Sequence, residues 1–183
     1  TPFPADNSLA DQLKIVARLI GGRAGLGAKR QVFMVALDGF DVHDTMALRQ
    51  PALLKKLSSA LGAFDSALRE LGMSDKVTTF TASDFGRTLS LNGDGTDHGW
   101  GGHQFVMGGS VQGKAFYGTV PPLSTGNTSA PEDQWHVGQG RLLPSTSVDQ
   151  YAATLARWFG VAEPEPYGVL PNLANFGERA GRL

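Results

Sequence analysis

Two short apolar segments, and the amphipathic stretch between them, most constrain how this chain can fold. Residues 31–41 (QVFMVALDGFD) form an apolar run rich in Val and Phe, which is typical of a buried strand. Residues 76–82 (KVTTFTA) predict a second strand. Between them, the leucine spacing over residues 51–71 predicts a helix that Pro51 opens and Gly72 ends. A strand–helix–strand order implies a right-handed crossover, and therefore an α/β fold with a mostly parallel sheet flanked by helices.

Weaker patterns predict the remaining elements. A helix over residues 7–20 would be capped by Asn7 or Ser8. Residues 147–159 have the pattern of a second helix, with Ser147 and Gln150 as a capping box and Gly160 as its stop. The other expected features are a third strand over residues 104–107, a small β-hairpin over 114–120 and long loops over 85–103 and 121–140.

Composition excludes several classes of protein. The 183 residues carry a net charge of −1, which favours neither a nucleic-acid partner nor an anionic membrane surface. No apolar run approaches the roughly 20 residues of a membrane span. The absence of cysteine removes disulfides, thiolate metal ligands and cysteine nucleophiles. Because glycine is abundant, with 24 residues, we expect loops that approach a ligand closely.

Aspartate and histidine gather where the predicted strands end. Ligands of open α/β sheets bind beyond the carboxyl ends of the strands, and the segments at these places read LDGFDVHD (37–44), ASDFGRT (82–88) and GDGTDHGWGGH (93–103). Carboxylates and imidazoles together suit Zn, Mn, Mg or Fe, and such an ion can act as a Lewis acid. The sequence thus predicts a divalent-metal site. Its candidate ligands are Asp38, Asp41, His43, Asp84, Asp97, His98 and His103.

Each candidate also has a structural interpretation. An aspartate at a strand end often serves only as a turn or cap residue, and Asp38, which precedes a glycine, fits a turn as well as it fits a metal site. Arg87 fits two roles equally: it would bind an anionic group of a substrate, or pair with one of the clustered aspartates. His136 stands alone in a polar loop, where we expect it to be solvent-exposed.

Two long stretches, TFTASDFGRTLSLNGDGTDHGWGGHQFVMGG and GRLLPSTSVDQYAATLARWFGV, resemble domain-of-unknown-function family 1501. That family consists of bacterial proteins that are typically exported by the twin-arginine route, which implies a periplasmic or extracellular location. The resemblance implies that residues 1–183 are the C-terminal part of one alkaline-phosphatase-like α/β domain. The missing N-terminal half would then be a partner, and this incomplete domain would expose apolar surface and dissolve poorly alone.

The family is similar in turn to the alkaline phosphatases and sulfatases, which bind one or two divalent metals through Asp and His at strand ends. The resemblance implies that Asp41 and His43 are one ligand pair, although only one residue separates them. Asp84 looks like the Asp of an Asp-His pair whose histidine is replaced by Phe85. The last ligand would be a histidine before the following strand. Its candidates are His98 and His103, and the Asp97-His98-Gly99 letters match a superfamily motif. The implied cofactor is a divalent metal (Zn, Mn, Mg or Ca), with Arg87 as a catalytic anion contact and the nucleophile on the missing half.

Three functions compete. The first is a metal-dependent hydrolase of phosphate or sulfate esters, with a small anionic ester as substrate. The second is a non-catalytic relative that binds a ligand or partner on the same scaffold. The third is a hydrolase with a Ser-His-Asp triad built on Ser83 and Asp84, which the absence of a G-x-S-x-G pattern disfavours.

Overall fold

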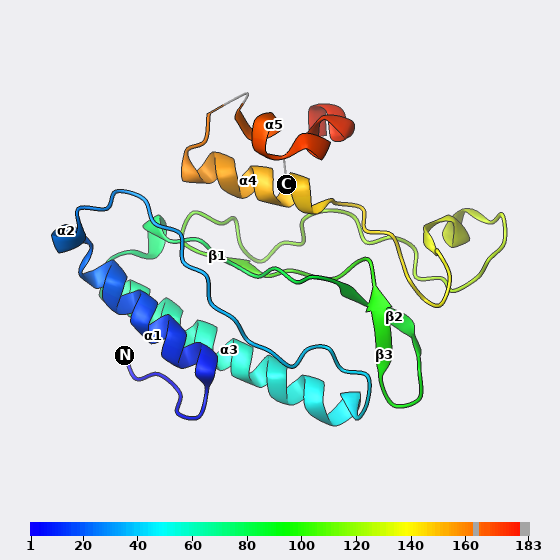
Figure 1. The fold of residues 1–183 in the computed structure, drawn as a ribbon, viewed down its shortest axis with the longest axis horizontal. Helices are drawn as coiled ribbons and strands as arrows, with labels where there is room; N and C mark the ends of the chain where they lie inside the picture. Colours follow the sequence, from blue (N-terminus) through cyan, green and yellow to red (C-terminus); the bar gives the residue numbers. More distant parts are fainter. Residues whose placement is uncertain (163–164, 180–183) are drawn as a thin grey trace.

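A computed structural model describes residues 1–162 and 165–179 as an elongated arrangement of helices on either side of narrow antiparallel sheets (Figure 1). Helix α1 (Ser8–Gly21) begins where the sequence predicts, because the Asn7 side chain accepts a hydrogen bond from the Ala10 amide at 3.2 Å. The Asn7 amide also donates to the Lys56 carbonyl at 2.9 Å. Asn7 is therefore both the cap of α1 and a link to the helix beside it.

Helix α3 (Met46–Glu70) packs along α1 and forms the main core with it (Figure 1). The buried face predicted from Leu54 to Leu71 is confirmed at Phe64 and Leu68, each 2% exposed, but its two ends, Leu54 (41%) and Leu71 (37%), are exposed. The predicted start is wrong, because the helix begins at Met46 and Pro51 lies inside it. Short helices flank this pair: α2 (Arg23–Leu26) follows α1, and the 3-10 helix η1 (Ser74–Lys76) follows α3.

The predicted mostly parallel, alkaline-phosphatase-like sheet is wrong. The described residues form two small antiparallel sheets, each of two strands. In one, β1 (Thr79–Phe80) pairs with β4 (Val106–Met107). In the other, β2 (Gly86–Leu91) pairs with β3 (Thr96–Gly99). The crossover from 31–41 through α3 therefore joins no parallel strands.

Residues 31–41, all of them described, form no strand although their apolar pattern predicted one. One side of this segment packs on the α1–α3 core through Phe33, Val35 and Leu37. The Gln12 side chain binds both the amide and the carbonyl of Ala36, at 2.9 and 2.8 Å, and so occupies groups that a neighbouring strand would use. Apolar burial thus orders this segment without strand pairing.

The predicted strands over 76–82 and 104–107 survive only as β1 and β4. Residues 114–120 form no hairpin in the part of the chain that the structure describes. A hairpin forms instead within residues 86–99, where the sequence predicts a long loop. Its turn spans Asn92 to Gly95, whose backbone groups bond at 3.1 Å. Residues 121–140 form the predicted loop, apart from the 3-10 helix η2 (Pro131–Trp135).

Helix α4 (Val148–Phe159) confirms its predicted limits, with the capping box at Ser147 and Gly160 in the left-handed conformation at its end. It packs against α5 (Glu165–Val169) and the 3-10 helix η3 (Pro171–Arg179), forming a second small apolar cluster. The Tyr151 hydroxyl donates to the Thr81 carbonyl at 3.2 Å, so α4 is held to the end of β1. This cluster lies apart from the α1–α3 core (Figure 1).

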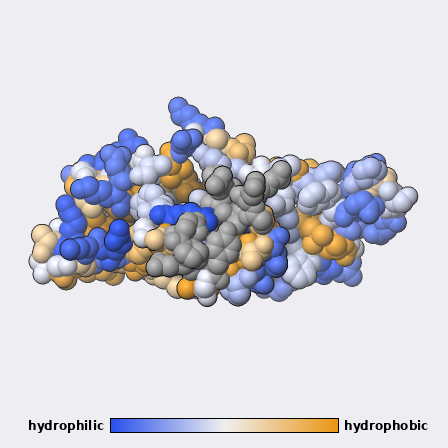
Figure 2. Space-filling view, turned by 90° about the horizontal axis from the view of Figure 1, so that it is seen from above, coloured by the Kyte–Doolittle hydropathy of each residue, from blue (hydrophilic) through white to orange (hydrophobic). Residues whose placement is uncertain are grey.

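Apolar residues also reach the surface. Met34 and Phe116 are 94% and 91% exposed. Figure 2 shows apolar residues scattered among hydrophilic ones along an elongated face of the molecule. Among the described helices, none is long and apolar enough to cross a membrane, as the sequence predicts.

Candidate metal centre

The loop before α3 lies beside the β2–β3 hairpin, near the start of α3 (Figure 1). The Thr96 amide donates to the Val42 carbonyl at 3.4 Å, and the Met46 amide donates to the Asp94 carbonyl at 3.0 Å. A Cβ atom at Gly95 would lie 2.2 Å from the carbonyl carbon of His43, so only glycine allows this approach. The hairpin turn therefore packs closely against the backbone of the loop.

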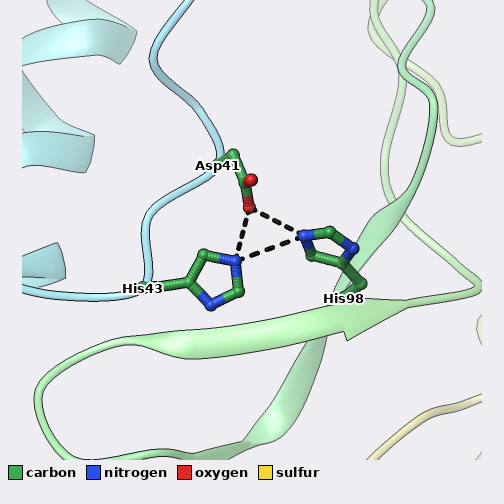
Figure 3. A group of neighbouring side chains, drawn as sticks. All are labelled: Asp41, His43 and His98. Carbon is green, nitrogen blue, oxygen red and sulfur yellow. Dashed lines mark hydrogen bonds and ion pairs between the residues drawn. The ribbon is translucent and has the colours of Figure 1, made fainter.

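Three side chains converge where these segments meet: Asp41 and His43 from the loop, and His98 from β3 (Figure 3). The Oδ1 atom of Asp41 lies 2.9 Å from the Nε2 atom of each histidine. The two Nε2 atoms lie 3.2 Å apart. Val42, between Asp41 and His43, is 2% exposed, whereas the two flanking side chains are exposed.

Protons alone do not satisfy the hydrogen-bonding needs of these three atoms, which we call the triangle: Oδ1 of Asp41 and Nε2 of His43 and of His98. If both Nε2 atoms carry a proton, both can donate to Asp41, but two N–H dipoles then lie side by side. If only one carries a proton, that N–H is shared between Asp41 and the other nitrogen, whose lone pair also faces the carboxylate. A cation at the centre removes the conflict, because it accepts a lone pair from all three atoms.

The spacing of these atoms fits a divalent ion. Zinc bonds of about 2.0–2.1 Å in a tetrahedral arrangement separate neighbouring ligand atoms by about 3.3 Å, close to the 2.9–3.2 Å between these three. One carboxylate and two imidazoles suit zinc or another transition metal better than Mg or Ca, which prefer oxygen alone. Three protein ligands leave a fourth position for water or substrate. The three side chains are about half exposed, at 46–51%, so an ion held by them would be within reach of solvent.

Arg87, on β2 directly opposite His98, ion-pairs with the same Asp41 oxygen. Its other nitrogens donate to the Val42 carbonyl at 2.7 Å, and to the hydroxyl (2.9 Å) and carbonyl oxygens of Thr96. Of its two predicted roles, the structure shows the pairing with a clustered aspartate. Among the described residues, the Oδ2 atom of Asp41 has no hydrogen bond or ion pair and stays available to another partner.

Electrostatics keep the carboxylate of Asp41 ionised. Desolvation raises its pKa, but hydrogen bonds from Arg87 and His98 and the charges of the two histidines outweigh this effect and lower the pKa below its usual value. Asp41 is thus an anion, as a metal ligand must be.

Two neighbours hold the imidazole rings. The Phe85 ring stacks on the His98 ring with a centroid distance of 3.7 Å and an interplanar angle of 13°. The Oδ1 atom of Asp97 lies 3.5 Å from the Nδ1 atom of His43. Neither role is predictable from the sequence pattern of the single residues, because both depend on the β2–β3 pairing. The signal was present in the alternation of RTLSL and TDHG around an Asn-Gly-Asp-Gly turn, which is typical of a hairpin.

The other predicted ligands lie outside the triangle. Asp38, Asp84 and His103 are exposed, and within the described residues their side chains make no hydrogen bond or ion pair. Asp84 lies between β1 and β2, and His103 lies between β3 and β4. The structure therefore brings together Asp41, His43 and His98, and leaves Asp84 and His103 apart from them.

Comparison with known proteins gives a family without a stated activity. The family described as "Protein of unknown function (DUF1501)" matches residues 4–167, a range that includes the whole candidate centre. No curated protein and no solved structure matches the chain. On the extent of the family match, the chain belongs to the DUF1501 family.

Proposed function

We propose that Asp41, His43 and His98 bind one divalent transition-metal ion, and that the protein uses this ion to hydrolyse phosphate or sulfate esters. One observation carries the proposal: an ionised carboxylate and two imidazole nitrogens converge to within 3.2 Å of one another at an exposed position. The ester class comes from the sequence resemblance to phosphatases and sulfatases. A location outside the cytoplasm belongs to the same proposal.

Each residue of the centre would have a role that follows from its chemistry. Asp41, His43 and His98 would supply the ligand atoms, and Arg87 would balance the charge of Asp41. When bound, the ion supplies a Lewis acid and a water of lowered pKa. In the overall hydrolysis, water adds to phosphorus or sulfur, the ester bond breaks, and the alcohol leaves with a proton from that water.

A second candidate function is metal or ligand binding without turnover. Arg87 supports it, because its guanidinium is used inside the protein by Asp41, Val42 and Thr96 rather than directed at an anion. Bound metal with no ester hydrolysis would establish this function instead.

Two histidines five residues apart provide the test. His98 lies in the triangle and His103 outside it, and both are exposed. We expect the purified 183-residue chain, loaded with Zn²⁺ or Mn²⁺ and then desalted, to retain about one ion per chain by elemental analysis. His98→Ala should lose this ion and His103→Ala should keep it. Chromogenic phosphate and sulfate esters, assayed on the same samples, then separate catalysis from binding.

Three results would overturn the proposal. A wild-type chain without retained metal removes the site. Equal metal content in wild type and in both His98→Ala and Asp41→Asn places the ion elsewhere. Loss of metal in His103→Ala alone shows that His103, rather than the triangle, holds it.

A further inference from the structure

The two histidines of the candidate centre are held in different ways. His98 is fixed by a stacked ring, whereas His43 faces a carboxylate at each of its ring nitrogens. Its Nε2 atom faces Asp41 at 2.9 Å, and its Nδ1 atom faces Asp97 at 3.5 Å. A histidine that binds a metal through one nitrogen typically donates its other N–H to a carboxylate or carbonyl, which fixes the tautomer and the ring orientation.

Asp97 is itself held in place. Its backbone amide donates to the hydroxyl of Thr88 at 3.0 Å, and Thr88 is only 5% exposed. Its Oδ1 atom, the same atom that faces His43, accepts a hydrogen bond from the Asn92 side chain at 2.7 Å. The hairpin therefore presents this carboxylate to His43 in one orientation.

We infer that Asp97 is the positioning residue of His43: it accepts the Nδ1 proton, so that the Nε2 lone pair points at the metal ion. This inference rests on the proposed function. It gives Asp97 a role in orienting a ligand rather than in binding the ion, and it extends the centre through Asn92 to the hairpin turn.

The same turn contains a matched control. Asp94 is exposed, carries the same charge, and its side chain makes no hydrogen bond or ion pair within the described residues. Asp94→Asn and Asp97→Asn therefore remove the same charge from the same hairpin, but only the second changes the group that faces His43.

The experiment measures Zn²⁺ affinity of the 183-residue chain by competition with a chromophoric chelator. We expect Asp97→Asn to bind about 10–100-fold more weakly than wild type, the usual effect of losing an outer carboxylate. Asp94→Asn should bind as wild type does, and Asp97→Glu should recover part of the loss. In the Zn²⁺-loaded wild type, nitrogen-15 NMR should show His43 protonated at Nδ1 and bound to metal through Nε2.

The experiment distinguishes failure of the proposed function from failure of the inference about Asp97. A wild type that binds no Zn²⁺ overturns the proposed function and this inference together. A wild type that binds Zn²⁺, with equal affinity in Asp97→Asn and Asp94→Asn, overturns the inference alone. Binding of His43 through Nδ1 also overturns it, and that result needs no variant, so a misfolded Asp97→Asn chain does not prevent a decision.

Discussion

Arg87 connects three segments through a single side chain. It pairs with Asp41 in the loop before α3, binds the Val42 carbonyl in that loop, and binds Thr96 in the neighbouring strand. Its side chain is 21% exposed, so these contacts are partly shielded from water. Hydrogen bonds to charged groups in such places contribute more than those of an exposed ion pair.

Arg87→Gln should therefore destabilise the protein by about 2 kcal/mol, since hydrogen bonds to a charged group contribute about 1.5–3 kcal/mol. Urea unfolding followed by circular dichroism measures the free energy. Arg49→Gln is the control, because it breaks the more exposed Arg49–Asp44 pair and should cost less than about 1 kcal/mol. Equal costs for the two variants would contradict the bridging role of Arg87.

At the scale of elements, the loop over residues 121–143 is organised by Asp133, which is 8% exposed. Its carboxylate accepts hydrogen bonds from the Ser124 hydroxyl, and from the Thr128 amide at 3.0 Å and hydroxyl. His136 is half-buried and contacts the carbonyl of Gly126 and the amide of Gly140. The prediction that His136 is exposed to solvent is therefore wrong. A loop that looks irregular in sequence thus has an internal polar network.

This network predicts acid sensitivity. Hydrogen bonds from Ser124 and Thr128 lower the pKa of Asp133 in the folded protein, against its ordinary value of about 3.9. A lowered folded pKa means that the stabilisation is complete above pH of about 4 and is lost as the pH falls through the folded pKa. Asp133→Asn should therefore be less stable than wild type at neutral pH, and the gap should narrow in acid. Urea unfolding at several pH values measures it, and a gap that is constant with pH would contradict the assignment.

At the scale of the whole molecule, the candidate centre joins segments that are distant in the chain. Asp41 and His98 are 57 residues apart, and neither belongs to one of the two apolar clusters, which are themselves separate. An ion bound by both segments would act as a cross-link that exists only in the folded state, so metal binding and folding should be coupled.

Thermal unfolding should show this coupling. Zn²⁺ at 100 times its Kd should add about 2.7 kcal/mol of stability. For a chain of this size that corresponds to a rise of about 5–10 °C in Tm, at about 2–4 °C per kcal/mol. A chelator should reverse the rise, and His98→Ala should show none of it. A rise of the same size in His98→Ala would mean that the stabilising ion binds outside the triangle.

Local patterns in the sequence determined most ends of the three long helices, although not the start of α3 at Met46. The caps at Asn7 and Ser147 and the stops at Gly72 and Gly160 depend on backbone groups within a few residues, so they can be recognised without the rest of the fold. The spacing of apolar residues likewise indicated the buried face of α3 at Phe64 and Leu68. The enrichment of Asp and His between residues 38 and 103 was also visible in the sequence alone.

Only the tertiary structure decided how these parts combine. An apolar run such as 31–41 predicts burial on one side, but it does not predict whether a strand lies beside it. Here the segment packs on α1 and α3, and the Gln12 side chain binds its backbone groups in place of a strand. The choice of His98 over His103 depends on the β2–β3 register, which places His98 opposite Arg87 and beside Asp41. Strand pairing and the convergence of side chains bring together residues that are distant in sequence, and no local pattern records which of two nearby histidines will face the same point in space.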